Sequence, residues 1–329
     1  MSPPPVIADA AVEPRLVASS SAALVKAHAA RATATPVSDN AFLGIGFIIA
    51  STVFFAGSDV AAKLLTHTIP PVEIAWMRYV VFCLMVLPAV AWTGGRRGLA
   101  TTRLPMQVLR ALGMVSSAVV FMVALGHLPV AEATAINFVS PIFITALSIP
   151  LLGEKVGLRR WIAAAVGLAG VLIVVQPGGA SFQLAALLPA VSAAIWACSA
   201  ILTRLMSSEK PEVTLAWSAI VGFVVLTVAV PYAWVTPDAT ELWYGLIMGV
   251  GSTIGHWLLV LGYRRAGASL LAPFSYTQLV WASGLGFLVF GAIPGLWTLV
   301  GGAVIAASGL YTAHRERVRA QMERSAKAA

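Results

Sequence analysis

Residues 54–80 read FFAGSDVAAKLLTHTIPPVEIAWMRYV, and this stretch has a second copy at residues 195–221, which read IWACSAILTRLMSSEKPEVTLAWSAIV. Eight of the 27 aligned positions are identical, and Pro70 and Pro211 are one such pair. Identical apolar residues are common by chance between membrane helices. The shared proline and the shared Ala-Trp pair are therefore the stronger evidence for a repeat. We therefore expect two related structural units, a design that is frequent among transporters.

The composition indicates a membrane protein. Of 329 residues, 59% are hydrophobic and 10% are charged, and the mean hydropathy is +0.88. A soluble domain carries about 25% charged residues, so an ordinary water-facing surface is excluded. Cys83 and Cys198 lie in apolar runs, which favours neither a disulfide framework nor a metal site.

Hydropathy predicts an all-α integral membrane protein with ten transmembrane helices. Alternating segments typical of a membrane β-barrel are not found in the sequence. The expected spans are 42–65, 74–92, 106–125, 131–151, 160–176, 183–205, 214–234, 241–263, 269–290 and 295–313.

Basic residues predict the orientation. With ten spans, 19 of the 21 Lys and Arg residues fall on one side, and the other two, Lys63 and Arg78, lie within spans. The positive-inside rule then makes both termini cytoplasmic, in a bacterial-type inner membrane. We expect a disordered cytoplasmic tail at 1–40 and a basic cytoplasmic tail at 314–329. The net charge of +8 is thereby explained without a nucleic-acid partner.

Two five-helix repeats are expected to fill the chain between the tails, at 41–176 and 183–313. A second, weaker match pairs residues 131–154 with residues 269–292. Because five is odd, the repeats cross the membrane in opposite senses. Inverted repeats place a solute site near the midplane and permit alternating access. The leading hypothesis is therefore a secondary or facilitative transporter.

Several motifs resemble the EamA type of the drug/metabolite transporter superfamily. They are Trp76–Met77–Arg78–Tyr79, Arg110, the run ALGHLPVAEATAINFVSPIFITALSIPLLGEK at 124–155 and its counterpart at 272–311. The resemblance spans about 41–313 and implies ten helices in two inverted repeats around a central cavity. It departs at Glu154, whose counterpart in the second copy is Ala292.

The resemblance is nearest to uptake members that serve cofactor-like metabolites such as riboflavin or S-adenosylmethionine. An exporter of amino acids, amines or drugs on the same fold is the alternative.

Polar side chains inside spans are the candidate substrate ligands, because such groups are costly in lipid. Ser275, Tyr276 and Gln278 place three polar groups within four residues. At an offset of 138, Asn137 aligns with Ser275 and Ser140 with Gln278. Interhelical hydrogen bonding would also account for serine and asparagine.

Two further candidates for substrate binding are His256 and Trp196. His256 follows Gly251 and Gly255, whose spacing favours close helix approach. The histidine fits a substrate ligand, a proton carrier or a buried neutral side chain equally well. Trp196 fits either stacking on a flat ligand or bundle packing.

Four charged residues are candidates for coupling or gating. Asp59 and Lys63 are four residues apart. With Arg78 they form either a charged lining at the outer mouth of the cavity or an internal Asp59–Lys63 pair with Lys63 reaching to the interface. Arg78 also fits a packing role. Glu132 opens the fourth span, where it fits either the outer mouth or a helix cap.

An enzyme and a channel are the rival classes. No HExxH, GxSxG or P-loop motif occurs, and nothing resembles a channel filter. We expect no enzyme activity, no resident cofactor and no metal. The expected partners are a small-molecule solute and the lipid bilayer; proton coupling and the choice between monomer and homodimer stay open.

Overall fold

The computed structural model describes residues 41–94, 99–152, 158–176, 183–206, 208–265, 271 and 274–328, and every regular element within them is helical. The expected tail at 1–40 and Glu154 lie outside these residues. The elements are α2 (Ala41–Leu65), α3 (Pro71–Gly94), α4 (Leu104–His127), α5 (Val130–Asn137), α6 (Ser140–Leu152), α7 (Leu158–Val175), η2 (Leu184–Leu187), α8 (Leu188–Leu205), α9 (Pro211–Ala229), η3 (Val230–Ala233), α10 (Ala239–Arg265), α12 (Thr277–Phe290) and α13 (Leu296–Ala328).

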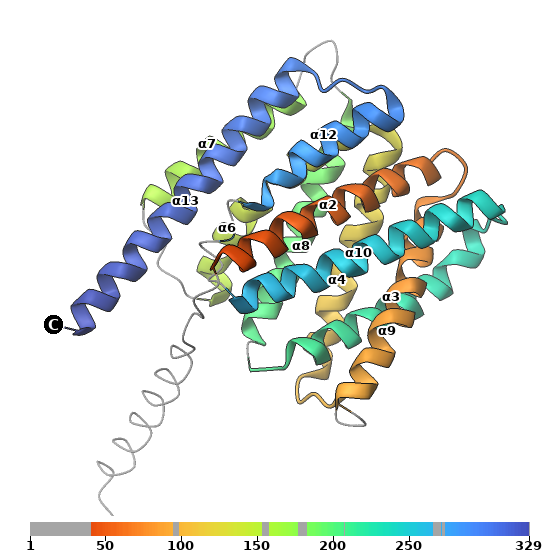
Figure 1. Cartoon of the computed structure of the whole chain (residues 1–329), viewed down its shortest axis with the longest axis horizontal. Coiled ribbons are helices and arrows are strands. Elements are labelled where there is room, and N and C mark those ends of the chain that lie inside the picture. Colours follow the sequence, from red (N-terminus) through yellow and green to blue (C-terminus); the bar gives the residue numbers. More distant parts are fainter. Residues whose placement is uncertain are drawn as a thin grey trace, which may run out of the picture.

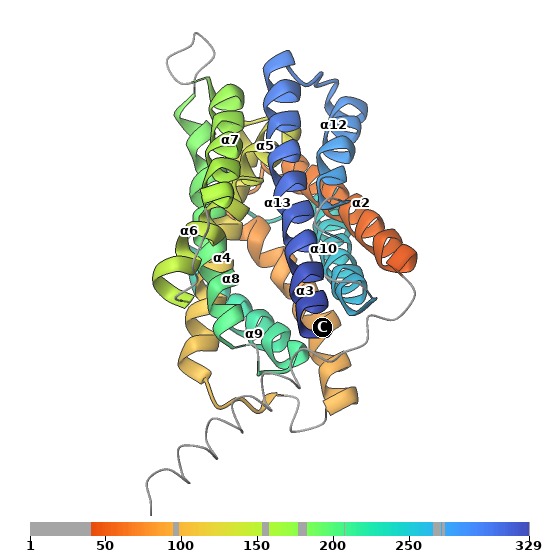
Figure 2. The same ribbon diagram turned by 90° about the vertical axis from the view of Figure 1, so that its left-hand side faces the viewer.

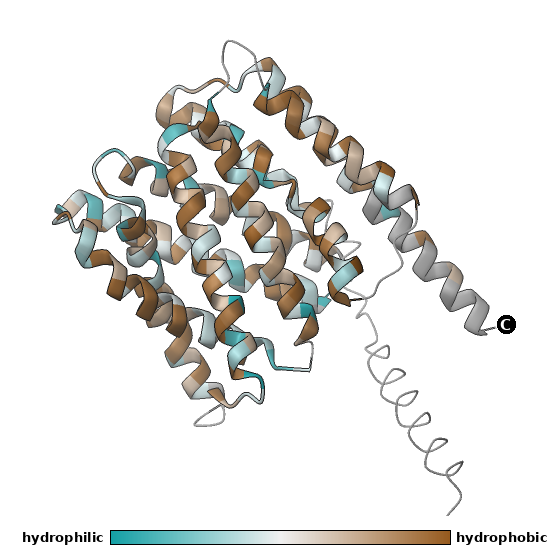
Figure 3. Cartoon of the chain, turned by 180° about the vertical axis from the view of Figure 1, so that it is seen from behind, coloured by the Kyte–Doolittle hydropathy of each residue, from teal (hydrophilic) through white to brown (hydrophobic). Residues whose placement is uncertain are grey.

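Seven segments of the described chain are long and apolar enough to cross a membrane, and three shorter apolar helices accompany them. Hydrophobic residues, brown in Figure 3, occupy much of the length of the helices. Many of their large apolar side chains are exposed on the bundle. Phe42 is 88% exposed, Trp92 93% and Leu288 76%. Such a surface is unfavourable in water and favourable against lipid tails. The protein is therefore a multi-pass membrane protein.

Both copies of the repeated proline stand at the start of a helix. Pro70 directly precedes α3, and Pro211 is the first residue of α9. Proline lacks an N–H and has a helical φ, so the first turn is the one place in a helix that accepts it without loss. The prolines thus fix where two of the long helices begin.

The sequence predicts interruptions in two of the expected spans, because Pro141 and Pro273 lie within them. The span predicted at 131–151 is divided into α5 and α6 by Phe138 and Val139. In the span predicted at 269–290, a turn at Tyr276 precedes α12. Phe138 and Tyr276 are related by the same offset of 138 residues that aligns the two copies in sequence.

The helices pack as two groups with α3 and α13 between them. In Figure 2, α2, α10 and α12 lie on one side and α4, α6, α7 and α8 on the other. Helix α10 runs beside α2 in Figure 1, as the Gly251–Gly255 spacing predicted. A Cβ added at Gly255 would lie 2.8 Å from the Phe55 ring, so only glycine permits this approach.

Candidate functional site

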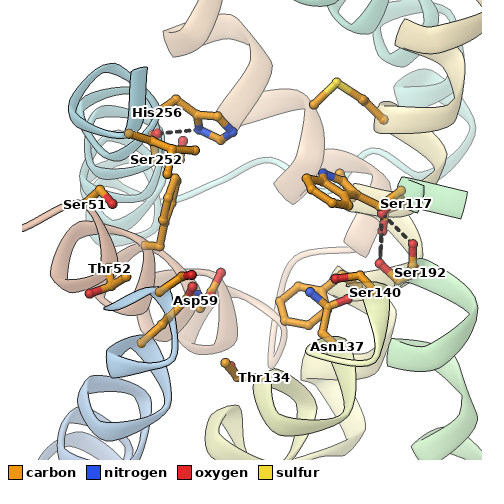
Figure 4. A pocket seen from close by; sticks show the side chains of 18 of the residues that line it. Ser51, Thr52, Asp59, Ser117, Thr134, Asn137, Ser140, Ser192, Ser252 and His256 are labelled. Carbon is orange, nitrogen blue, oxygen red and sulfur yellow. Dashed lines mark hydrogen bonds between the residues drawn. The ribbon is translucent and has the colours of Figure 1, made fainter. Parts of the chain in front are cut away.

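A cavity of about 470 Å³ lies between the two helix groups. Figure 4 shows Asp59 of α2 and His256 of α10 on one wall, facing Ser117, Asn137 and Ser192 on the other. Its lining comes from α2, α3, α4, α5, α6, α8, α9, α10 and α12 and from the segment that leads into α12. Most of these residues lie near the middle of their helices, so the cavity is at mid-bundle depth.

Nine of the eleven candidates for substrate binding, coupling or gating line this cavity. They are Asp59, Arg78, Asn137, Ser140, Trp196, His256, Ser275, Tyr276 and Gln278. Lys63 and Glu132 do not belong to the lining. The second of these stands in the first turn of α5, where a carboxylate is favoured by the helix dipole.

Asp59 and Lys63 do not form the internal pair that their spacing suggested. The Gln278 amide Nε2 donates to Asp59 Oδ2 at 3.2 Å, which joins α2 to α12. Asp59 is 9% exposed, and Arg78 lines the same cavity. Asp59 is the one acidic residue among the cavity-lining residues that the structure describes. Because a buried carboxylate needs hydrogen-bond donors, the Gln278 amide stabilises Asp59 at this position.

Lys63 instead binds the end of α4. Its Nζ donates to the backbone carbonyl of Leu125 at 2.8 Å and to that of Leu128 at 2.7 Å. The same ammonium lies 5.8 Å from the ring centroid of Phe290, the last residue of α12. Carbonyls at a helix C-terminus lack helical partners and attract cations. Lys63 therefore joins α2, α4 and α12 at the end of the bundle away from the basic loops.

The two arginines of the family-like motifs differ in their surroundings. Arg110 of α4 donates to Thr203 Oγ1 and to Ser218 Oγ, each at 2.6 Å, so it ties α4 to α8 and α9. Arg78 of α3 lines the cavity, and its guanidinium carbon lies 5.9 Å from the Tyr79 ring centroid. Arg110 is thus a structural tie, whereas Arg78 places a positive charge at the cavity wall.

His256 is held by its own helix. Its Nδ1 lies 2.8 Å from the Ser252 carbonyl oxygen, as Figure 4 shows. A carbonyl only accepts hydrogen bonds, so Nδ1 carries the proton. The Phe55 ring packs edge-on against the imidazole with centroids 4.9 Å apart. This contact fixes the plane of the imidazole ring at the cavity wall.

The opposite wall contains a reciprocal serine clasp. Ser117 Oγ donates to the Ser192 carbonyl at 2.9 Å, and Ser192 Oγ donates to the Ser117 carbonyl at 2.8 Å. These bonds cross-link α4 and α8.

Three polar lining residues that were not singled out from the sequence lie one helical turn from residues that were. Ser192 precedes Trp196 by four residues, Ser252 precedes His256 by four, and Thr134 precedes Asn137 by three. Helical periodicity around the chosen residues would have identified them.

Helix α5 presents unsatisfied polar atoms to the cavity wall. In the described part of the chain, four buried side-chain polar atoms lack a hydrogen-bond partner, and two of them are Thr134 Oγ1 and Asn137 Oδ1. Both residues line the cavity. Leaving such an atom unpaired costs about 1–3 kcal/mol, so its presence requires an explanation.

Aromatic rings adjoin these atoms. The rings of Phe138 and Tyr276 contact each other with centroids 5.0 Å apart and planes tilted by 45°. Both line the cavity. The Tyr276 hydroxyl, however, contacts the backbone of α13 at Gly309, where an added Cβ would collide with it. Tyr276 therefore offers the cavity its ring, while its hydroxyl group packs against α13.

Comparison of the sequence with known proteins finds a family and several related transporters. The model of the EamA-like transporter family matches residues 42–176 and again residues 183–313. A riboflavin transporter of Vibrio cholerae is 29% identical over 261 residues, covering 78% of this chain and 87% of that protein. An S-adenosylmethionine uptake transporter of Rickettsia bellii is 28% identical over 276 residues, covering 84% and 94%.

Two further similarities are more distant. A pseudopaline exporter of Pseudomonas aeruginosa is 24% identical over 268 residues, covering 80% of this chain and 93% of that protein. A solved crystal structure with 22% sequence identity covers 81% of this chain and 96% of its own, with a TM-score of 0.59, which relates the two folds. The family and relative names are those of transporters, not enzymes. Together with the matched 42–176 and 183–313, they establish that the chain belongs to the EamA-like transporter family of the drug/metabolite transporter superfamily.

Proposed function

We propose that this protein is a secondary or facilitative uptake transporter for a small cofactor-like organic solute of the riboflavin or S-adenosylmethionine type. The observation that carries the proposal is the mid-bundle cavity of about 470 Å³, which has aromatic and polar walls. Its volume falls within the range of 300–1,000 Å³ common for small-molecule sites. The uptake transporters related to it over most of their length support the choice of solute.

The proposed architecture is ten transmembrane helices in two inverted repeats, at 41–176 and 183–313. The two separate matches to one family model support this division, as does the pairing of Phe138 with Tyr276 in both sequence offset and contact. Alternating access follows from rocking one repeat against the other around the cavity. The basic loops support cytoplasmic termini in a bacterial inner membrane.

Contacts at the end of the bundle away from the basic loops support a conformation in which that end is closed. There Lys63 binds the α4 carbonyls, and Leu65, Ile69 and Leu125 are completely or almost completely buried. Toward the opposite end of α10, the lining residue Tyr263 is 47% exposed. We infer that the cavity communicates with the cytoplasm in this state.

The substrate residues in this proposal are Gln278, Tyr276, Asn137, Ser140, His256 and Trp196. Asp59, Lys63, Arg78 and Glu132 serve coupling or gating. Asp59 is the best candidate to carry a coupling proton, because it is buried in the cavity wall and its partners are side chains that can rearrange.

The test is uptake into proteoliposomes that contain the purified full chain. Radiolabelled riboflavin and S-adenosylmethionine are supplied separately, with and without unlabelled solute inside. A carrier gives saturable uptake that internal solute accelerates. Flux that does not saturate would indicate a channel, and chemical conversion of the solute would indicate an enzyme.

Export is the second candidate function. The similarity to a pseudopaline exporter favours it, since the same fold serves outward transport in that protein. Everted vesicles and right-side-out vesicles, each with an imposed proton gradient, separate the two directions. Accumulation only in everted vesicles would replace uptake by export.

A further inference from the structure

The part of the solute that contacts α5 can be inferred from the chemistry of the wall. Thr134 is 2% exposed, and its Oγ1 has no partner among the described residues. The same holds for Asn137 Oδ1, one helical turn further along. The side chains share one face of α5 and line the cavity, as Figure 4 shows.

In the described part of the second repeat, no buried side-chain polar atom lacks a hydrogen-bond partner. Gln278 is bonded to Asp59, and Thr277 Oγ1 donates to the Phe274 carbonyl at 2.6 Å. The Ser117–Ser192 clasp likewise uses its own hydroxyls. Of the buried unpaired atoms in the described residues, the two that belong to cavity-lining residues are therefore Thr134 Oγ1 and Asn137 Oδ1, and a solute is the partner that would complete them.

An asparagine amide selects a particular chemistry. It presents a donor and an acceptor side by side in one plane, so it pairs with a planar group that has the complementary arrangement. Asparagine reads adenine in this way, through the exocyclic amine and the adjacent ring nitrogen N7. The N3–H and neighbouring carbonyl of a flavin ring present the same arrangement.

Aromatic rings stand next to this pair of residues. Phe138 follows Asn137 directly, and its ring contacts that of Tyr276. Flat heteroaromatic rings stack on such side chains. A ring that lies against Phe138 and Tyr276 brings its edge to α5.

We propose that Thr134 and Asn137 read the hydrogen-bonding edge of a nitrogen heteroaromatic ring, which Phe138 and Tyr276 support. This inference rests on the proposed uptake function and names the part of the solute that determines specificity. A flavin and an adenine nucleoside both carry such a ring. They are the two sources that the experiment separates.

The experiment measures equilibrium binding to the purified full chain in nanodiscs. Riboflavin and S-adenosylmethionine are compared with N3-methylriboflavin and the 7-deaza analogue of S-adenosylmethionine, each of which lacks one edge contact. The variants are Thr134→Val and Asn137→Leu. The matched control is Thr145→Val on α6, a residue outside the cavity lining whose hydroxyl donates to the Pro141 carbonyl.

We expect the wild type to bind one of the two parent solutes. Each α5 variant should then weaken that solute about two- to tenfold, the effect of one hydrogen bond, and Thr145→Val should leave it unchanged. The edge-blocked analogue should bind the wild type more weakly than the parent, and this difference should vanish in Asn137→Leu. Which parent binds identifies the source of the ring.

Thermal unfolding of the solute-free protein separates recognition from structure. Both variants remove an unpaired buried atom, so their melting temperatures should equal or exceed that of the wild type. A fall in both melting temperature and affinity would make the residues structural and overturn the inference.

Two other outcomes overturn different claims. If the wild type binds a parent solute and both variants bind it equally well, the edge contact is wrong and the uptake function stands. If the wild type neither binds nor transports either solute, the proposed substrate class is wrong, and the inference is overturned with it.

Discussion

The interrupted helices α5–α6 and α12 occupy matching places in the two sequence copies, yet they use their polar side chains differently. In α5, Thr134 and Asn137 leave atoms unpaired at the cavity wall. In α12, Gln278 donates to Asp59, and the Tyr276 hydroxyl packs on α13. An interruption in a membrane helix is tolerated where it borders a cavity. The contrast teaches that α5 has buried polar atoms with unused hydrogen-bonding capacity, whereas Gln278 and Tyr276 make contacts within the protein while also lining the cavity.

The largest effect on transport is expected at Asp59, the carboxylate that accepts a hydrogen bond from Gln278 of α12. Asp59→Asn preserves the size of the side chain and removes its capacity to exchange a proton at physiological pH. If Asp59 couples transport to protons, accumulation against a gradient should fall at least about tenfold while solute exchange persists. Gradient-driven uptake and counterflow in proteoliposomes measure the two activities.

Asp238→Asn provides the control for this change. Asp238 is exposed and caps α10, and asparagine caps helices equally well. If the Asp59→Asn variant accumulates solute as well as the wild type, Asp59 has no role in proton coupling and only bonds to Gln278 of α12.

A smaller effect is expected where one lysine joins both interrupted regions. Lys63 binds the Leu128 carbonyl shortly before α5 and lies against Phe290 at the end of α12. Lys63→Met should lower the free energy of unfolding by about 1.5–3 kcal/mol, because hydrogen bonds from a charged group are lost. Thermal unfolding in detergent measures the change. Lys210→Met, at an exposed lysine before α9, should be neutral, and equal stability of the two variants would contradict the joining role.

The packing of Tyr276 on α13 can be tested by a steric substitution. The expected loss of stability is similar to that of Lys63→Met. Gly309→Ala should destabilise by about 1–3 kcal/mol, since the new methyl group meets the tyrosine ring and hydroxyl. Gly284→Ala is the matched change on α12, where no atom lies within 4 Å of an added Cβ. It should be neutral or stabilising. Equal melting temperatures for the two variants would show that Tyr276 is not anchored on α13.

The smallest effect is expected from the tyrosine hydroxyl itself. Tyr276→Phe keeps the ring that faces the cavity and removes a group directed at Gly309. The half-saturation concentration for transport should therefore change less than about twofold, below the usual effect of one lost hydrogen bond. Tyr276→Ala is the companion variant, and it should raise this concentration clearly. A large effect of Tyr276→Phe would place the hydroxyl on the solute.

Hydropathy correctly predicted an all-helical membrane protein, because long apolar runs are local signals. Of the ten expected spans, seven correspond to segments of the described chain that are long and apolar enough to cross a membrane, and the other three correspond to shorter apolar helices. Most of the polar residues chosen because they lie in apolar surroundings line the cavity, since such groups are costly in lipid unless they are used. They are a minority of its lining residues.

Pro141 predicted an interruption of the span at 131–151, because proline lacks an N–H and disfavours helix in the residue before it. The break itself lies at Phe138 and Val139, just before α6. Tertiary contact with Tyr276 accompanies it, and sequence periodicity carries no sign of that contact.

The partner of Lys63 was missed for a similar reason. Spacing suggested Asp59, which lies four residues earlier on the same helix. Two backbone carbonyls at the end of α4 bind the ammonium instead. Helix-end carbonyls are strong acceptors that have no signature in side-chain letters, so only three-dimensional proximity reveals them.

The length of α13 has a mechanical consequence. Its 33 residues form one helix from Leu296 to Ala328, which at 1.5 Å per residue extends about 50 Å. That exceeds the hydrocarbon thickness of about 30 Å. A continuous helix transmits tilt along its axis, so its far end moves further than the portion packed on α7. A spin label there would act as a lever-arm reporter that turns small rotations of the bundle into measurable displacements.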